Sequence, residues 1–340
     1  MRIIVDAFGG DNAPLEILKA SRMAADEFGY DIILVGDEAT IKEVANKNNI
    51  SLKDITVSHA PNVITMEDAA TDIMKSKSNS SMAQGLRMLA EGMGDAFVSA
   101  GNSGALCVGA TLIVKRIKGI KRCAFAPVIP SAGGLFMLID SGANVECRPE
   151  MLKQFGIMGY IYMKNIMTIE EPRVALVNIG TESNKGDELR FESFKLLKET
   201  NINFIGNIEA RDIMADKADV VVCDGFTGNI ILKFYEGMGK AIFGKFGEIF
   251  QKSFKNKVAA SVLLPDIKKM KKHIDYKEYG GAPLMGISKS VFKAHGSSDA
   301  KTFKNAIRLA AEYEKRNVVK LITDCLKSEN LLKEKSEEED

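Results

Sequence analysis

The strongest constraint on how this chain can fold is a recurring pattern: a short apolar strand ends in a glycine-rich polar turn, and the turn leads into a helix. The clearest copy covers residues 219–233, where the β-branched run at 220–222 predicts a buried strand and an apolar-periodic helix begins near Gly228. The first N–H groups of such a helix face outward, and glycine lets the backbone approach a ligand, so the turn suits an anion. The alternative is a tight strand-to-helix connection that binds nothing.

Strands, loops and helices alternate in the same order along most of the chain, and this order predicts the fold class. Strands are predicted at residues 3–5, 32–35 and 55–59, with helices at 15–28 and 38–47 between them. The alternation predicts an α/β protein of three layers, in which a mostly parallel sheet lies between two layers of helices. Further strands are predicted at residues 96–99, 124–129, 135–139, 173–177, 203–208 and 290–294, the second and third of them joined by a hairpin-like turn.

The length of the chain and the absence of repeats and linkers indicate its domain organisation. A chain of 340 residues is long enough for one large α/β domain or two ordinary ones. No internal repeat and no linker rich in Pro, Gly or Ser occurs, so residues 1–327 are predicted to form a single catalytic domain that ends in one helix at 299–327. The hairpin at 124–139 and a protruding segment at 240–285, which includes a glycine-rich turn at 278–286, are candidates for a second lobe. The polar tail at 328–340 is predicted to fray.

Composition argues against several classes of function. A net charge of +1 and the absence of Trp give no sign of a nucleic-acid partner. Five widely spaced Cys and only three His predict reduced thiols and no metal site. No G-x-G-x-x-G, G-x-S-x-G or complete P-loop sequence occurs, and no cofactor is expected. The chain lacks a signal-peptide pattern and any apolar run near the roughly 20 residues of a membrane span, so a cytoplasmic location is expected.

Three polar loops that follow predicted strands could together hold a small anion. Their candidate residues are Gly101, Asn102, Ser103 and Gly104 in the first loop, Asn178, Gly180 and Lys185 in the second, and Asp224, Gly225, Thr227, Gly228 and Asn229 in the third. Main-chain N–H groups and amides supply uncharged donors, and Lys185 adds one positive charge, a combination that suits phosphate. Without a ligand, Lys185 would be a solvated loop lysine and the Asn would be turn residues. For His295, an exposed loop residue or a contact at a helix start is the favoured interpretation.

Seven motifs in a fixed order carry a resemblance to a known family. They are Asp6-x-x-Gly9-Gly10-Asp11, Ser99-Ala-Gly-Asn-Ser-Gly-Ala-Leu106, Asp140-Ser-Gly-Ala-Asn144, Asn178-Ile-Gly-x-Glu-x-x-Lys185-Gly186, Gly206-Asn-Ile-Glu209, Asp224-Gly-Phe-Thr-Gly-Asn229 and Glu278-Tyr-Gly-Gly-Ala-Pro283. Over about residues 1–325 the chain resembles the bacterial phosphate acyltransferases of the PlsX family, with Phe8 where a Met is expected.

The resemblance implies a reaction in which acyl-[acyl carrier protein] and inorganic phosphate give acyl phosphate and free carrier protein, for phospholipid synthesis. It also implies a fold similar to phosphotransacetylase and the isopropylmalate dehydrogenases, a homodimer, peripheral association with the membrane, and a downstream glycerol-3-phosphate acyltransferase. Because phosphate is itself the nucleophile, the site needs only to position it and to stabilise an oxyanion. In this hypothesis Lys185 binds phosphate or the oxyanion, Asn178 and Asn229 are amide donors, and Asp224 orients Lys185 or accepts a phosphate proton.

Residues 252–272 predict a contact surface, because lysines flank a short apolar run. The candidate membrane-contact residues are Val258, Val262, Leu263 and Leu264. The segment suits an anionic membrane surface, and its lysines could instead dock the acidic carrier protein. The third alternative is a solvated basic helix that packs on the partner subunit.

Two other functions stay open at the level of sequence. A phosphotransacetylase-type enzyme would use coenzyme A thioesters with the same phosphate chemistry, so the thioester that supports turnover separates the two reactions. A non-catalytic protein that binds the acyl carrier or regulates lipid synthesis would show binding without turnover.

Overall fold

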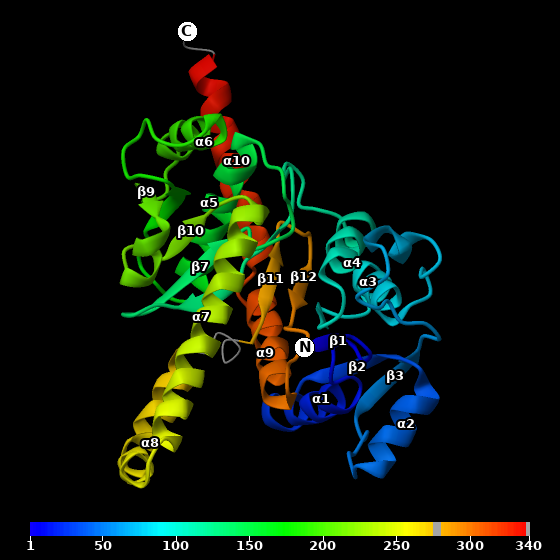
Figure 1. Cartoon of the computed structure of the whole chain (residues 1–340). Helices are drawn as coiled ribbons and strands as arrows, with labels where there is room; N and C mark the ends of the chain where they lie inside the picture. The colour runs from blue at the N-terminus through cyan, green and yellow to red at the C-terminus, as the bar shows by residue number, and fades with distance from the viewer. Residues whose placement is uncertain (275–279, 338–340) are drawn as a thin grey trace.

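The strands of the protein form two sheets, whereas the sequence analysis predicted a single mostly parallel sheet. The computed structural model describes the backbone of residues 1–274 and 280–337, and side chains for all of these except 268, 269, 271–274 and 329–337. Within this range one sheet has seven strands and the other has five. Helices cover both faces, so the predicted three-layer α/β fold is confirmed, and most neighbouring strands are parallel (Figure 1).

The larger sheet has the order β3–β2–β1–β4–β12–β11–β5. Its strands are β1 (Arg2–Asp6), β2 (Asp31–Gly36), β3 (Ile55–His59), β4 (Ala96–Ser99), β5 (Ala124–Phe125), β11 (Ala282–Met285) and β12 (Ser290–Lys293). Strands β3 to β12 in this order are parallel, whereas β11 pairs antiparallel with both β12 and β5. The turn predicted at 278–286 is wrong at 282–285, where the structure forms β11, because Gly280, Gly281 and Pro283 are residue types typical of turns. Residues 278 and 279 lie outside the described residues.

The smaller sheet has the order β6–β7–β10–β8–β9. Its strands are β6 (Val128–Pro130), β7 (Leu135–Ile139), β8 (Val174–Asn178), β9 (Phe204–Glu209) and β10 (Val220–Val222). The hairpin of β6 and β7 is confirmed. The single strand predicted at 124–129 is divided instead, because Pro127 interrupts it: β5 joins the larger sheet and β6 the smaller one.

Ten α-helices and three short helical turns connect the described strands. The helices are α1 (Leu15–Phe28), α2 (Glu38–Lys47), α3 (Ser81–Ala90), α4 (Ser103–Gly109), α5 (Pro149–Asn165), α6 (Glu188–Lys198), α7 (Gly225–Gln251), α8 (Phe254–Ile274), α9 (Ala300–Lys315) and α10 (Val318–Glu337), and the turns are η1 (Ala70–Met74), η2 (Ala110–Val114) and η3 (Ala210–Ala215). The single closing helix predicted at 299–327 is broken, because Asn317 adopts a left-handed conformation with φ of 53° between α9 and α10. Fraying of the tail stays a prediction: α10 continues to Glu337, and residues 338–340 lie outside the described range.

One apolar core is shared by both sheets. Alternate strand residues such as Val5 and Val220 point to this core, where α1, α5, α9 and α10 cover them. The intervening residues face two smaller clusters, so that Ile4 packs with α3 and α4 while Val221 packs with α7. Because one core serves both sheets, we propose that residues 1–327 are a single domain.

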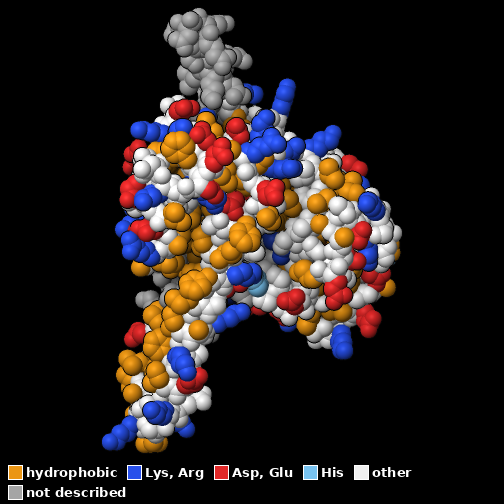
Figure 2. Space-filling view, turned by 45° about the horizontal axis from the view of Figure 1, so that its top comes forward, with side chains coloured by type: hydrophobic (Ala, Val, Ile, Leu, Met, Phe, Trp, Pro, Cys, Tyr) orange, Lys and Arg blue, Asp and Glu red, His pale blue; other side chains and the backbone are white. Residues whose placement is uncertain are grey.

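Helices α7 and α8 form an arm that projects from the body (yellow in Figure 1). Hydrophobic side chains gather along this arm (Figure 2). Val262 is 73% exposed and Phe234 is 67% exposed, far more than is usual for such residues. None of the described helices combines the length and hydropathy that a membrane crossing needs.

Substitution of Gly228 tests how the first turn of α7 packs against the turn after β7. A Cβ at this position would overlap the backbone carbonyl oxygen of Asp140. We expect Gly228→Ala to lower the free energy of unfolding by about 2 kcal/mol, because the start of α7 would have to shift.

Gly237→Ala is the matched control on the same helix, since no atom lies within 4 Å of the added Cβ. It should raise the free energy of unfolding by about 0.5 kcal/mol, because alanine restricts the unfolded chain. Both values come from denaturant titration, and equal effects of the two substitutions would contradict this packing.

Candidate active site

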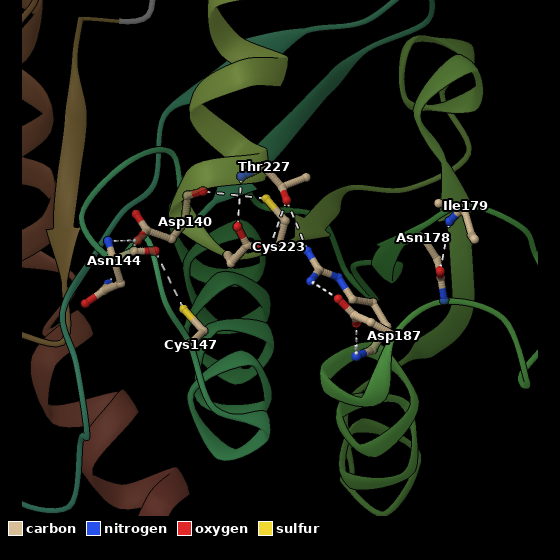
Figure 3. A network of polar contacts seen from close by, with 10 residues as sticks. Asp140, Asn144, Cys147, Asn178, Ile179, Asp187, Cys223 and Thr227 are labelled. Carbon is tan, nitrogen blue, oxygen red and sulfur yellow. Dashed lines mark hydrogen bonds and ion pairs between the residues drawn. The ribbon is translucent and has the colours of Figure 1, made fainter.

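The turn after β7 is organised by the buried carboxylate of Asp140. It accepts hydrogen bonds from the backbone N–H of Phe125 at 3.0 Å, Gly142 at 3.1 Å, Ala143 at 3.0 Å and Asn144 at 2.8 Å, and from the Asn144 amide at 2.9 Å. Figure 3 shows Asn144 beside Asp140. Burial raises the pKa of the Asp140 carboxyl, and these donors oppose that rise. The carboxylate therefore fixes the whole turn at the carboxyl end of the strand.

This turn holds the beginning of α7. The N–H of Gly225 donates to the carbonyl of Asn144 at 2.7 Å, and Gly228 packs on the carbonyl of Asp140. The N–H of Gly225 is therefore occupied within the protein. Gly225 and Gly228 allow the close approach of two backbone segments, which is the structural alternative to phosphate binding for both residues.

Asp224 caps α7 and forms an ion pair with Arg190. Its carboxylate accepts from the Thr227 N–H at 2.8 Å and from the Thr227 hydroxyl at 2.9 Å, and it also accepts from the guanidinium of Arg190. Arg190 contacts Asp187 as well, at 3.0 Å (Figure 3). The sequence hypothesis paired Asp224 with Lys185, whereas the structure pairs it with Arg190. The signal that could have indicated Arg190 is its position three residues after Asp187, the cap of α6.

Asn178 shapes the loop at residues 178–187. Its amide donates to the carbonyl of Lys185 at 2.9 Å, and its side-chain oxygen accepts from the N–H of Ile179 at 2.8 Å. Gly186 has a φ of 93° and leaves room for the Asn178 side chain. Gly180 lies against the aliphatic part of Lys185, whose side chain is exposed. Both polar atoms of Asn178 thus serve the loop.

A cleft of about 460 Å³ lies between the two sheets and brings together residues from distant parts of the chain. One wall is the face of α7 that carries Asn229, Lys233 and Glu236. The facing wall contains Lys293 and His295 at the end of β12, with Ser103 at the start of α4. Figure 2 shows this side of the molecule hollowed beside the arm. The carboxyl ends of parallel strands and the helix after them thus form a crevice, as in other α/β folds.

Two lysines, Lys233 and Lys293, line the cleft together with two acids, Asp11 and Glu236. Partial burial lowers the pKa of Lys293 from 10.5 to about 8; nearby Lys233 lowers it further, while Asp6 and Asp11 oppose the shift. The Lys293 ammonium donates to the carbonyls of Ala100 at 3.0 Å and Ala294 at 2.6 Å, which holds it in place. Because Lys233 is paired with Glu236, it repels the Lys293 ammonium only weakly, and a bound anion would contact both lysines.

A chain of polar contacts crosses the cleft. The Lys233 ammonium lies 3.0 Å from Glu236, whose other oxygen lies 3.8 Å from Nε2 of His295. Nδ1 of His295 accepts from the N–H of Ser297 at 3.2 Å, which leaves the ring proton on Nε2 in the neutral tautomer. An imidazole, two lysines and the neutral donors of Asn229 and Ser103 therefore line the same cleft.

The predicted site residues divide into two groups. Asn229 and Ser103 line the cleft, whereas Lys185 and Asn178 lie on the neighbouring loop and do not line it. Asn102 caps α4 by accepting from the N–H of Ala105 at 3.1 Å. The remaining candidates Gly101, Gly104, Gly180, Gly225, Thr227 and Gly228 are not cleft residues either.

Sequence reasoning missed most of the charged residues of the cleft. Lys233 and Glu236 follow Asn229 at the i+4 and i+7 positions of a helix, a spacing that could have indicated them. Lys293 ends an apolar strand, which is the position where ligands bind in such sheets. His295 was interpreted as an exposed loop residue or helix-start contact; it lines the cleft instead, because β12 is an interior strand of the larger sheet and ends beside the cleft.

A second, apolar groove of about 400 Å³ lies on the other side of α7. Its lining includes Ile129, Phe136, Ile231, Phe234 and Met238. Within the described residues, no group of three or more His, Cys, Asp or Glu could hold a metal ion.

The chain matches the family described as "Fatty acid synthesis protein" over residues 1–321. A "Phosphate acyltransferase" of Acetivibrio thermocellus is 48% identical over 92% of this chain and 93% of that protein, and one of Clostridioides difficile is 39% identical over the full length of both. The chain belongs to this family. As a member of the fatty acid synthesis protein family it is an enzyme, an acyltransferase, which removes the non-catalytic alternative.

Solved structures show the same fold. EutD phosphotransacetylase from Staphylococcus aureus aligns with a TM-score of 0.61 at 16% identity, over 92% of this chain and 94% of that one. A phosphotransacetylase from Streptococcus pyogenes aligns with a TM-score of 0.62 at 17% identity, over 92% and 93%. The predicted similarity to the phosphotransacetylase fold is confirmed.

The cleft should lose a positive charge near pH 8. Because Lys293 has a pKa of about 8, sulfate, which stays dianionic throughout, should bind more weakly as the pH rises past that value. From this group alone, stability should rise between about pH 8 and 10.5, since the unfolded chain still binds the proton that the folded chain has lost. Calorimetric titration with sulfate measures the first effect, with Lys293→Met as the control that removes the pH step. A sulfate affinity that is flat through pH 8 would contradict the assignment.

Proposed function

We propose that this protein transfers the acyl group of acyl-[acyl carrier protein] to inorganic phosphate, which supplies acyl phosphate for phospholipid synthesis. The observation that carries the proposal is the pair of cations, Lys233 and Lys293, on opposite walls of one cleft. Such a pair suits a small anion with one or two negative charges, which inorganic phosphate carries near neutral pH. The printed name of the relatives, phosphate acyltransferase, supports the same reaction.

In the proposed reaction a phosphate oxygen attacks the carbonyl carbon of the thioester. The C–O bond forms and the carbonyl oxygen becomes an oxyanion; when this intermediate collapses, the C–S bond breaks and the thiolate leaves with its electron pair. Lys233 and Lys293 hold the phosphate in position for attack. Asn229 and Ser103 are the neutral donors that face the cleft and suit the oxyanion. The hydrogen phosphate loses its proton as the acyl phosphate forms, and this proton goes to the leaving thiolate; His295, which lines the cleft, is placed to mediate the transfer.

The roles of the loop residues change accordingly. Asn178 is a positioning residue that shapes the loop at 178–187, and Asp224 positions Arg190 and the first turn of α7. Lys185 is exposed on that loop, and phosphate binding by Lys185 is the competing assignment. The two lysine positions can be separated by substitution.

The reaction is tested by incubating the protein with palmitoyl-carrier protein and phosphate. We expect a hydroxylamine-sensitive acyl phosphate that forms only when both substrates are present. Palmitoyl-coenzyme A with phosphate is the control. Turnover with the coenzyme A thioester alone would replace the proposal by a phosphotransacetylase-type reaction.

Substitution in the same assay locates the phosphate. Lys293→Met should lower kcat/KM for phosphate at least about a hundredfold, because the site loses one of the two cations that position phosphate. Lys185→Ala should stay within about tenfold of the wild type, since Lys185 lies outside the cleft. Thermal melts of both variants report folding. The reverse order of the two effects would place phosphate on the loop at 178–187.

The arm of α7 and α8 supports a proposal about location. Val258, Val262, Leu263 and Leu264 are between 41% and 73% exposed, and lysines such as Lys255 and Lys257 flank them. Lys268, Lys269, Lys271 and Lys272, which contributed to the same prediction, have no described side chains. We propose that this cytoplasmic protein is a homodimer whose arm rests on an anionic membrane surface, near a glycerol-3-phosphate acyltransferase that consumes its product.

Membrane contact is tested by reversing the character of the arm. Leu263→Glu with Leu264→Glu should abolish sedimentation with phosphatidylglycerol vesicles, because each carboxylate opposes both apolar insertion and the negative surface. Turnover with carrier-bound substrate in solution should be retained. Met93→Glu, at another exposed apolar position, is the control that should sediment normally. Undiminished sedimentation of the arm variant would refute the contact.

A further inference from the structure

A second basic surface lies on residues 115–122, which the proposed reaction leaves without a role. This basic loop contains Lys115, Arg116, Lys118, Lys121 and Arg122 and no acidic residue. The whole chain has a net charge of only +1, so the remainder of the protein is negative overall. Positive charge is therefore concentrated in one short segment rather than spread over the surface.

The basic loop is anchored to the body of the protein. Ile117 and Ile120 are each only 4% exposed and extend the apolar core beneath the loop. The N–H of Ile117 donates to the carbonyl of Gly286 at 2.9 Å. The side chain of Gln154 binds the loop twice, through the carbonyl of Gly119 at 2.9 Å and the N–H of Lys121 at 2.8 Å. A charged surface fixed in this way needs little ordering when a partner binds.

The cations of the basic loop are not neutralised by the described part of the chain. Lys115, Lys118 and Lys121 are exposed and form no ion pair with any described residue. The guanidinium of Arg116 donates to the carbonyl of Lys121, within the loop itself. Like charges held close together repel each other, and an acidic partner would remove that repulsion.

The basic loop is joined to the cleft through β5. Phe125, which lines the cleft, lies three residues after Arg122, a distance of at most about 10 Å along the chain. On its other side the loop follows η2 and α4, and α4 begins at the cleft residue Ser103. The loop contacts the turn between β11 and β12, at the end of β12 away from Lys293, so an extended thioester arm would carry the acyl group from a protein seated on the loop to the cleft.

We propose that the basic loop is the docking surface for the acidic carrier protein whose thioester enters the cleft, a proposal that rests on the function proposed above. The partner is a protein with a negatively charged face rather than a lipid surface, because the apolar residues of the loop, Ile117 and Ile120, are buried and cannot insert into a membrane. The lysines of α8, which lie among exposed apolar residues, have the opposite character.

The test compares charge reversal on the two basic surfaces. Lys118→Glu with Lys121→Glu alters the basic loop, and Lys255→Glu with Lys257→Glu is the matched control on α8; all four lysines are exposed. The loop variant should raise the Kd for acyl-carrier protein at least about tenfold at low salt, with a smaller difference at high salt. The α8 variant should bind the carrier protein as the wild type does. Turnover of acyl-pantetheine with phosphate should be the same in all three proteins.

The outcomes separate this proposal from the proposed function. Calorimetric binding needs no turnover, so docking is measured even if no acyl phosphate forms. Normal carrier binding by the loop variant would overturn the proposal, and so would an equal loss in both variants. Loss of phosphatidylglycerol vesicle sedimentation by the loop variant, with unchanged carrier binding, would also overturn it and assign the loop to the membrane.

Discussion

The arrangement of the site depends on one buried carboxylate, that of Asp140. A carboxylate removed from water is costly, and here the cost is offset by donors from Phe125 in β5 and from the turn that follows Asp140. The same turn accepts the first N–H of α7, and its backbone fills the space that Gly228 leaves open. The position of α7, and of the cleft wall that α7 forms, therefore depends on the hydrogen bonds of the Asp140 carboxylate.

Once seated, α7 separates two environments. Asn229, Lys233 and Glu236 face the polar cleft, while Ile231 and Phe234 line the apolar groove. Strand β6 does the same on a smaller scale, because successive strand residues point to opposite sides: Val128 lines the cleft and Ile129 the groove. Anion chemistry and apolar contacts are thus kept apart by the periodicities of one helix and one strand.

Local sequence patterns predicted most helices and strands, but they did not predict which distant segments pair or pack together. The buried run before Asp224 is a local signal, and the structure follows it with β10. Strand β11 and the division at Pro127 were missed, because each depends on a partner strand far away in the chain.

The cleft was missed for the same reason. Lys233 and Lys293 are 60 residues apart in sequence, and nothing in either segment alone indicates that the two ammonium groups share a space. Asn178 shows the converse: its residue type suits a ligand donor, yet its amide closes its own loop. The residue types at the strand ends pointed to the carboxyl ends of the strands as the place of the site. The role of each residue there could be assigned only from the tertiary contacts.

The length of α7 has a mechanical consequence. The helix runs without a break over 27 residues, about 40 Å, from the pivot at Asp140 to the tip of the arm. A stiff rod held near one end acts as a lever, so a tilt at the outer tip also rotates the inner segment that carries Asn229 and Lys233. A contact on the arm and the α7 wall of the cleft therefore belong to one continuous helix.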